Sequence, residues 1–165
     1  MTFPHALVVR AEEAEHVALP HGGGFHLLVD ASGTGGVLGA NRLVLGEGAD
    51  GARPHYHAVS WELFHVLDGT VDFLLGDRMT SVGAGGLVAV PPGMPHAFGA
   101  APGTGADLFV VLTPGIERFD YFRALGRIQH GLERFETLLP EQERYDVHFL
   151  DPAVWQAARA RPPRP

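Results

Sequence analysis

Short apolar runs separated by turn residues recur along the chain as far as about residue 113. The runs are rich in Val, Leu and Phe, and glycine-containing turns such as Asp68-Gly69 and Gly76-Asp77 separate them. This spacing of short strands predicts an all-β sandwich or barrel, because no segment between the runs is long enough for a crossover helix. The predicted strands are Ala6–Arg10, Phe25–Val29, Val37–Leu45, Trp61–Leu67, Val71–Leu75, Arg78–Ser81, Leu87–Val90, Ala97–Phe98 and Leu108–Leu112.

The pattern changes after residue 113, where apolar residues begin to recur at helical spacing. Ile116, Phe119, Phe122 and Leu125 predict one helix, a second short helix is expected after Pro140, and a third is expected over about residues 151–160. We therefore expect a single domain with four parts. These are an N-terminal strand or arm (1–24), a β-barrel (25–113), helices that pack on the barrel (114–160) and a tail (161–165).

The composition excludes several classes of function. The chain of 165 residues contains no cysteine, which excludes disulfides, zinc fingers, iron–sulfur clusters and thiolate nucleophiles. All twelve basic residues are arginine, so a Schiff-base enzyme and a lysine-containing phosphate loop are excluded as well. The net charge of −7 argues against nucleic acid or a membrane surface as the partner, and no apolar run is long enough to span a membrane. No signal peptide is recognisable, so we expect a cytoplasmic protein.

Two blocks of residues indicate a metal site. His55 and His57 are separated by one residue, and an extended segment places both imidazoles on the same face, where they can reach one ion. Glu62 follows His57 by five residues, and Gly69 follows Glu62 by seven. The second block, downstream, consists of Gly85, Pro91, Pro92, Gly93 and His96.

These blocks, GARPHYHAVSWELFHVLDG and GGLVAVPPGMPHAF, resemble the two motifs of the cupin superfamily over about residues 46–100. The resemblance implies a single cupin (jelly-roll) β-barrel with a C-terminal α-helical flank. It also implies one metal inside the barrel, bound by His55, His57, Glu62 and His96. Two motif positions differ, since Ala49 stands where the first glycine is expected and Ala100 replaces the closing asparagine. Both positions concern turns and packing rather than metal ligands.

The ligand types narrow the cofactor to one divalent transition metal per subunit. Three imidazoles and one carboxylate suit Fe, Mn, Ni, Co, Cu or Zn, and they leave open positions for water, dioxygen or a substrate oxygen. Glu62 is also the predicted catalytic residue, because a carboxylate at a metal can take a proton from an enol or hydroxyl. The resemblance to flavonol dioxygenases of this fold implies the same role for Glu62.

The alternation of side chains along a strand predicts the lining of the site. It places Glu62, Phe64 and Val66 on one face, and it turns Phe98 towards the inside of the barrel. Such a pocket is apolar and aromatic, and it suits a planar, poorly soluble small molecule as the substrate.

Two further predictions concern the rest of the barrel. Asn41 and Arg42 lie on a strand before the first motif, and one of them is expected to supply a polar contact in the pocket. Trp61, Leu63 and Leu67 share the outer face of their strand, so this face should be covered by the C-terminal helices or by a second subunit. Single-barrel cupins are commonly dimers, and we expect a homodimer.

Three functions are compatible with this site. The C-terminal flank resembles that of bacterial cupins labelled quercetin 2,3-dioxygenase-like, which favours a metal-dependent dioxygenase acting on a flavonol-like or other enolisable aromatic substrate. The alternative is a zinc-dependent polyketide cyclase or isomerase of specialised metabolism, in which the metal acts only as a Lewis acid. The third is a small-molecule-binding cupin without turnover. One fold hosts many functions, so the sequence leaves these possibilities open.

Overall fold

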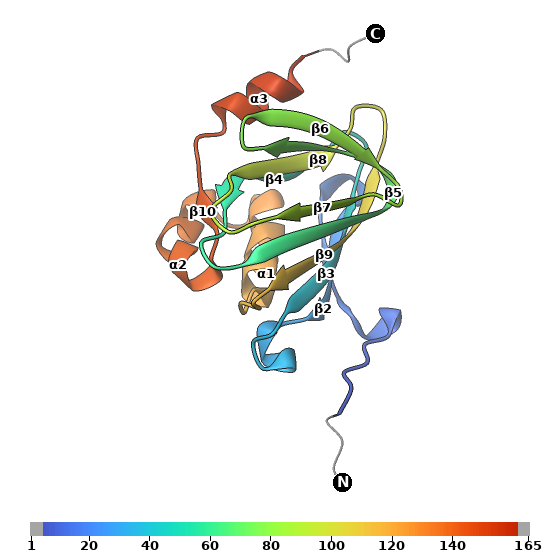
Figure 1. Cartoon of the computed structure of the whole chain (residues 1–165), viewed down its shortest axis with the longest axis vertical. Coiled ribbons are helices and arrows are strands. Elements are labelled where there is room, and N and C mark those ends of the chain that lie inside the picture. Colours follow the sequence, from blue (N-terminus) through green and yellow to red (C-terminus); the bar gives the residue numbers. More distant parts are fainter. Residues whose placement is uncertain (1–4, 162–165) are drawn as a thin grey trace.

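The computed structural model describes residues 5–161, and most of this length is β-sheet with helices towards the C-terminus (Figure 1). The strands are β1 (Glu15–Ala18), β2 (Gly24–Val29), β3 (Gly39–Leu45), β4 (Asp50–Tyr56), β5 (Trp61–Leu75), β6 (Arg78–Gly83), β7 (Leu87–Val90), β8 (His96–Ala100), β9 (Ala106–Thr113) and β10 (His148–Phe149). The α-helices are α1 (Phe119–Gln129), α2 (Gln142–Tyr145) and α3 (Ala153–Arg159). Short 3-10 helices are η1 (Ala11–Glu13), η2 (Pro20–Gly22), η3 (Ala31–Thr34) and η4 (Phe135–Glu141).

The strands form one curled, antiparallel sheet that encloses the core, which confirms the predicted β-barrel with a helical flank. The strand order is β1-β2-β3-β9-β5-β8-β4-β10, and β6 and β7 both pair with β5. The long strand β5 joins the two halves of the sheet. Its first part pairs with β7 and β9, and its second part pairs with β6 and β8.

The prediction of two strands joined by a turn at Asp68-Gly69 is wrong, because β5 runs without a break through this point. The pairing of β5 with β9 shifts register between Val66 and Asp68, which indicates a β-bulge at Leu67, and Asp68 and Gly69 then continue the pairing with β9 instead of forming a hairpin. Gly69 has a φ of +74°, and a Cβ at this position would overlap the carbonyl oxygen of Gly105. Glycine is therefore needed where the strand bends from one half of the sheet into the other.

The core fills the inside of the curled sheet, as the alternation of apolar residues predicts. Phe64 and Val66 from the first part of β5 meet Phe73 from its second part, and all three are fully buried. Leu108 of β9 and Phe98 of β8 complete the centre of this cluster. The aromatic rings pack edge to face, with centroids of Phe64 and Phe98 4.9 Å apart.

The N-terminal part differs from its prediction in detail. Ala6–Arg10 is not a strand, and the first strand is instead β1, which pairs with β2 at the edge of the sheet. Strand β4, which carries the first candidate ligand, was not among the predicted strands because its residues are mostly polar or glycine. Of the predicted terminal segments, residues 1–4 and 162–165 lie outside the described residues.

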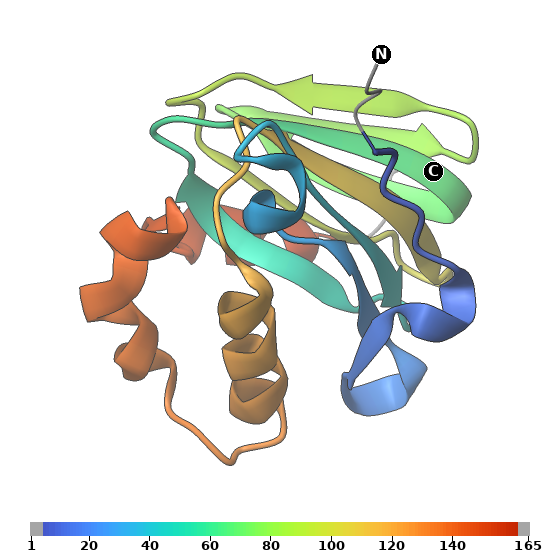
Figure 2. The same ribbon diagram turned by 90° about the horizontal axis from the view of Figure 1, so that it is seen from below.

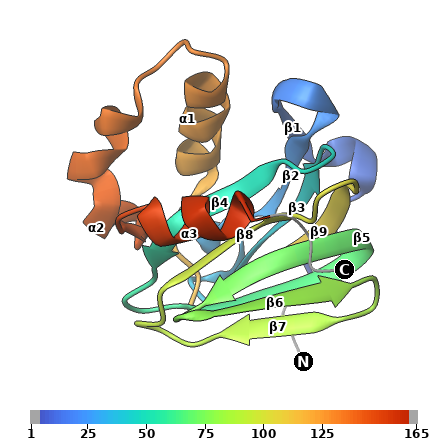
Figure 3. The same cartoon turned by 90° about the horizontal axis from the view of Figure 1, so that it is seen from above.

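The helices after β9 lie against different parts of the sheet (Figure 2). In α1, Phe122 and Leu125 pack against the barrel core, and the ring centroid of Phe122 lies 4.8 Å from that of Phe25. Helix α3 lies across β4 and β8, where the buried Trp155 packs on Leu74 and Ala97 (Figure 3). None of the helices in residues 5–161 is both long and apolar enough to be a membrane span.

The outer face of the first part of β5 is left uncovered by these helices. Trp61 and Leu67 are 46% and 45% exposed, and Leu87 of the neighbouring strand β7 is 57% exposed. The helices lie on other sides of the sheet (Figures 2 and 3), so they do not provide the predicted cover. Cover by a second subunit stays a prediction.

Candidate metal centre

Four buried side chains meet at one end of the barrel, and we call them the ligand cluster. His55 lies near the end of β4, His57 just beyond it, Glu62 at the start of β5 and His96 at the start of β8. Strands β4 and β8 pair His55 with His96, which brings two ligands from distant parts of the sequence side by side. One potential ligand atom from each of the four lies within 4.8 Å of the others.

Hydrogen bonds fix the orientation of all three imidazoles in the ligand cluster. Each Nδ1 lies within hydrogen-bond distance of a backbone carbonyl and donates to it, so Nε2 is the ring nitrogen left to bind a metal. The acceptors are the carbonyl oxygens of Arg53 (2.7 Å from His55), Asp146 (2.6 Å from His57) and Met94 (2.9 Å from His96). The Nε2 atoms point towards Glu62 Oε2, at 2.9 Å for His57, 2.8 Å for His96 and 3.9 Å for His55.

This donor set fits a divalent transition metal. Three neutral imidazole nitrogens and one carboxylate oxygen are ligands that such ions prefer, and partners for the second ring nitrogens are typical of metal-binding histidines. Burial, with the other two imidazoles, lowers the pKa of His55 well below 6.5, so its ring is neutral. Burial alone would raise the pKa of Glu62, but His57 and His96 hold it well below 4.5, so the carboxylate is ionised. Both groups are therefore in the protonation state that ligation requires.

Asp146 connects the ligand cluster to the C-terminal helices. It ends α2 with a φ of +49°, and its carbonyl oxygen is the acceptor for His57. Its carboxylate accepts three backbone N–H bonds from the loop between His57 and Glu62. The donors are Ala58 (2.6 Å), Val59 (3.1 Å) and Ser60 (3.1 Å). One residue thus holds both the imidazole of His57 and the loop that leads to Glu62.

Arg118 brings a buried positive charge to the same place. It precedes α1, and its side chain is buried, with Nε donating to the carbonyl oxygen of Tyr145 at 3.0 Å and NH2 3.2 Å from His57 Nδ1. Burial lowers the pKa of Arg118 from 12.5, while the negative charge of Glu62 opposes this effect. The backbone at this point is held by Asp30, whose carboxylate accepts the N–H groups of Arg118 (2.7 Å) and Phe119 (3.0 Å).

A small cavity of about 40 Å³ lies against the ligand cluster. Its wall consists of barrel residues on one side and the first turns of α1 on the other. From α1 and the residue before it come Arg118, Tyr121, Phe122 and Leu125. Burial raises the pKa of Tyr121 to about 12, so its phenol keeps its proton and can donate it in a hydrogen bond. Helix α1 therefore forms the cover of the candidate metal centre.

The predicted pocket residues are distributed between this cavity and other places. Asn41 and Phe98 line the cavity together with His55, His57 and Glu62. Phe64 and Val66 are packed in the core behind the ligand cluster and do not line the cavity. Arg42 points to the opposite face of β3, where its guanidinium forms an ion pair with Asp107.

Arg118, Tyr121 and Asp146 were not among the residues proposed from the sequence. For the first two, a signal exists, because Arg118, Tyr121, Phe122 and Leu125 follow the spacing i, i+3, i+4, i+7 that places residues on one helix face. An arginine on such an apolar stripe indicates a buried charge. Asp146 has no comparable signal, since its role depends on the contact of α2 with a loop almost ninety residues earlier.

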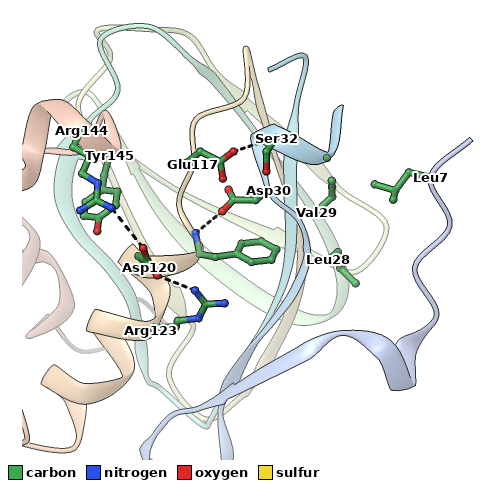
Figure 4. Close-up of a pocket in the computed structure, with 12 residues that line it drawn as sticks. Leu7, Leu28, Val29, Asp30, Ser32, Glu117, Asp120, Arg123, Arg144 and Tyr145 are labelled. Atoms are coloured by element: carbon green, nitrogen blue, oxygen red, sulfur yellow. Dashed lines mark hydrogen bonds and ion pairs between the residues drawn. The ribbon is translucent and has the colours of Figure 1, made fainter. Parts of the chain in front are cut away.

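A second, larger depression of about 440 Å³ lies on the outer side of the same helix (Figure 4). Its wall is a network of paired charges, in which Asp120 contacts Arg123 and Arg144, and Glu117 accepts the N–H of Ser32. These groups satisfy one another, and Asp30 in the same wall anchors the start of α1. This depression is part of the support of α1.

Comparison with protein families gives a match to the cupin domain over residues 41–113. This range includes all four residues of the ligand cluster and the strands that carry them. No curated protein matches the sequence of the chain.

Solved structures with the same fold share little sequence with this chain. KdgF from Halomonas sp. has a TM-score of 0.58 at 17% identity, with 71% of this chain and 99% of that chain covered. The polyketide cyclase RemF from Streptomyces resistomycificus has a TM-score of 0.56 at 20% identity, with 67% and 80% covered. The nucleoside dehydratase Pac13, a Streptomyces protein, has a TM-score of 0.53 at 19% identity, with 70% and 88% covered. At these identities the likeness shows the fold.

Proposed function

Since this chain belongs to the cupin superfamily, we propose that it is an enzyme that binds one divalent transition metal in the ligand cluster and acts on a small-molecule substrate. The observation that carries the proposal is the convergence of four buried donor atoms within 4.8 Å, with the Nδ1 atom of every imidazole already bonded to a carbonyl. When bound, the metal supplies Lewis acidity to a substrate oxygen. The donor set accepts Fe, Mn, Ni, Co, Cu or Zn.

The chain's own residues provide the means to move protons next to that oxygen. Glu62 is ionised, and its close contacts to His57 Nε2 (2.9 Å) and His96 Nε2 (2.8 Å) are both made by Oε2. Oε1 can therefore accept a proton from an enol, a hydroxyl or a carbon acid. Tyr121 lies in the wall of the same cavity with its proton retained, so it can donate a hydrogen bond or return a proton.

A base and an acid facing one small cavity favour a non-oxidative reaction. Isomerisation, elimination and cyclisation through an enolate each remove one proton and place another. We therefore place this class, which includes the zinc-dependent cyclase or isomerase, first. Two proteins of the same fold, the nucleoside dehydratase Pac13 and the polyketide cyclase RemF, have activities of this class.

The dioxygenase acting on a flavonol-like substrate is the second candidate, and the donor set supports it because the same ligands suit iron, manganese, nickel and copper. The cavity does not favour it, since about 40 Å³ is far below the roughly 300–1,000 Å³ of pockets that hold ligands of that size. A planar aromatic substrate would require Phe122 and Leu125 of α1 to move. A cupin that binds a small molecule without turnover is the third candidate.

Metal analysis combined with assays under two atmospheres tests the proposal. The wild type and a control, His65→Ala on the outer face of β5, should hold about one metal per chain, and His57→Ala and His96→Ala should hold far less. Turnover of enolisable hydroxy acids and ketones without oxygen supports the first candidate, and oxygen consumption with flavonols supports the second. Failure of the wild type to retain any of the six metals would refute the proposed function.

A further inference from the structure

Arg118 is the one residue with a positive charge in the wall of the cavity described above, and the ligand cluster does not need it as a ligand. The side chain is only 5% exposed, and its guanidinium uses Nε for the carbonyl oxygen of Tyr145 and places NH2 3.2 Å from His57 Nδ1. Nδ1 already donates to Asp146, so it is not an acceptor for Arg118 in the tautomer that binds metal. The NH2 group and NH1 therefore have donors to spare beside the cavity.

Within residues 5–161, no carboxylate forms an ion pair with this guanidinium. The two nearby aspartates are occupied elsewhere, since Asp30 accepts backbone N–H groups at the start of α1 and Asp146 accepts those of the loop before Glu62. A buried guanidinium whose neighbouring carboxylates all have other hydrogen-bond partners is only partly compensated, which is costly to a folded protein. Such a charge persists in a site where it meets a ligand of opposite sign.

The sum of the charges that face the cavity also favours an anionic ligand. Glu62 and Arg118 are the charged residues in its wall, so they cancel, and a bound divalent metal would leave an excess of two positive charges. In a buried site this excess attracts an anion strongly. A neutral substrate would leave the excess uncompensated.

We propose that Arg118 is the residue that selects the substrate, by donating hydrogen bonds to an anionic oxygen, and that the substrate is a small carboxylate whose neighbouring carbon or hydroxyl meets Glu62. This inference rests on the proposed function and names its substrate class. Arginine suits the task because its planar fork matches the two oxygens of a carboxylate. The cavity admits the charged end of such a molecule, consistent with its volume of about 40 Å³.

A second hollow lies next to the cavity. A groove of about 340 Å³ on the outside of the barrel shares Phe25, Gly51 and Leu125 with the cavity, so these three residues separate the two spaces. The groove is walled by apolar residues such as Leu19 and Pro20 and by the polar side chains of Asp50 and Gln129. A tail could reach this groove only if the side chains of Phe25 and Leu125 moved apart, so the cavity as it stands suits a short carboxylate.

Binding of a matched pair of probes to the cobalt(II) form of the protein tests the proposal. Pyruvate and pyruvamide have nearly the same size, but only pyruvate is an anion. The visible absorption of bound cobalt reports binding of either probe without any turnover. The variants are Arg118→Met, Arg118→Gln and Arg118→Lys, and the control is Arg127→Met, which removes an arginine from the solvent-exposed side of α1.

We expect the two neutral variants to bind pyruvate about 10- to 100-fold more weakly than the wild type, because a hydrogen bond to a charged group is lost. Their affinity for pyruvamide should change less than about threefold. Arg118→Lys should retain part of the affinity for pyruvate, because it keeps the positive charge but not the planar fork. The control Arg127→Met should bind both probes as the wild type does. Arg118→Gln keeps a donor for Tyr145, so it serves if Arg118→Met does not fold.

Three results would overturn the inference. They are unchanged pyruvate binding in the neutral variants, an equal loss for both probes, and a wild type that does not prefer pyruvate. An equal loss would mean that Arg118 only positions His57. These outcomes differ from failure of the proposed function, which would appear earlier as a wild type that does not retain cobalt.

Discussion

Asp146 is the most informative residue outside the ligand cluster, because one carboxylate holds the loop between two ligands. Its Oδ1 accepts the N–H of Ala58 at 2.6 Å, and its Oδ2 accepts those of Val59 and Ser60 at 3.1 Å each. In the variant Asp146→Asn, one of these oxygens becomes an NH2 group that cannot accept a hydrogen bond. The amide can turn so that its remaining oxygen stays on Val59 and Ser60, and its NH2 group then faces the N–H of Ala58. Asparagine tolerates the left-handed backbone at this position, so the substitution isolates the loss of the acceptor.

The size of the effect follows from which donors are left without a partner. Ala58 and Val59 are exposed and can bond to water, whereas Ser60 is fully buried. The variant therefore places two donors against each other at Ala58 and removes the charge from the bonds to Val59 and Ser60, which together should cost about 1–2 kcal/mol of the free energy of unfolding. The carbonyl oxygen of Asp146 also orients His57, so movement of this residue should reduce metal affinity about 10- to 100-fold.

The assay has two parts, with Asp151→Asn as the matched control. Asp151 lies in the same C-terminal segment, is exposed, and accepts a single N–H bond from Ala153. Urea denaturation of the chelator-treated proteins gives the stability difference, and competition with a metal-binding dye gives the affinity. If Asp146→Asn resembles Asp151→Asn in both measurements, Asp146 does not hold the ligand loop and the reasoning fails.

Three further predictions test other parts of the structure. The metal-free protein should lose stability as the pH falls below about 6.5, because the pKa of the buried His55 is held well below that value while the unfolded chain binds the proton. The free energy of unfolding should fall by up to about 1.4 kcal/mol per pH unit for each proton that the unfolded chain takes up. Urea titrations at several pH values should show a weaker pH dependence for His55→Gln, and an unchanged one for the control His65→Gln. In the same titrations, Gly69→Ala should lower the free energy of unfolding by roughly 2–4 kcal/mol, because the new Cβ would overlap backbone atoms. The control Gly76→Ala also has a positive φ but has open space around the new Cβ, so it should lower the free energy of unfolding by only about 1 kcal/mol. Trp155→Ala should lower the free energy of unfolding by about 3–5 kcal/mol, because this side chain attaches α3 to the sheet. Unfolding followed by circular dichroism measures the change, and a loss below about 1 kcal/mol would show that α3 is not needed for stability.

The architecture of the barrel could be predicted because its signals are local. Inward-facing apolar residues alternate along β5 and β9, and glycine marks most of the turns between strands. The same locality explains the error at Gly69. A glycine after an aspartate is typical of a hairpin turn, and only the long-range pairing of β5 with β9 shows that the strand continues through it.

The candidate metal centre likewise has a part that local sequence patterns predict and a part that they do not. His55, His57 and Glu62 lie within eight residues of one another, so a short motif is sufficient to identify them. Arg118 and Asp146 reach the site from helices whose position depends on tertiary packing, and their partners lie 61 and 88 residues away in the sequence. No periodicity within a single segment can reveal contacts of that kind.

The barrel and the helical segment after it make different contributions to the candidate site. The part of the chain that matches the cupin domain ends at residue 113 and supplies the metal-binding atoms, which are compatible with six metals and with several reactions. The guanidinium of Arg118, which we propose to select the substrate, and the phenol of Tyr121, which we propose as the proton donor, come from the helical segment that follows. The same segment supplies Asp146, which keeps His57 in the orientation that ligation requires. Metal binding and substrate selection are therefore mechanically linked, because a displacement of α1 and α2 that admits a larger substrate also removes a support of the ligand cluster. For this reason the protein should favour small substrates whose reactive end enters the cavity while the cover formed by α1 stays in place.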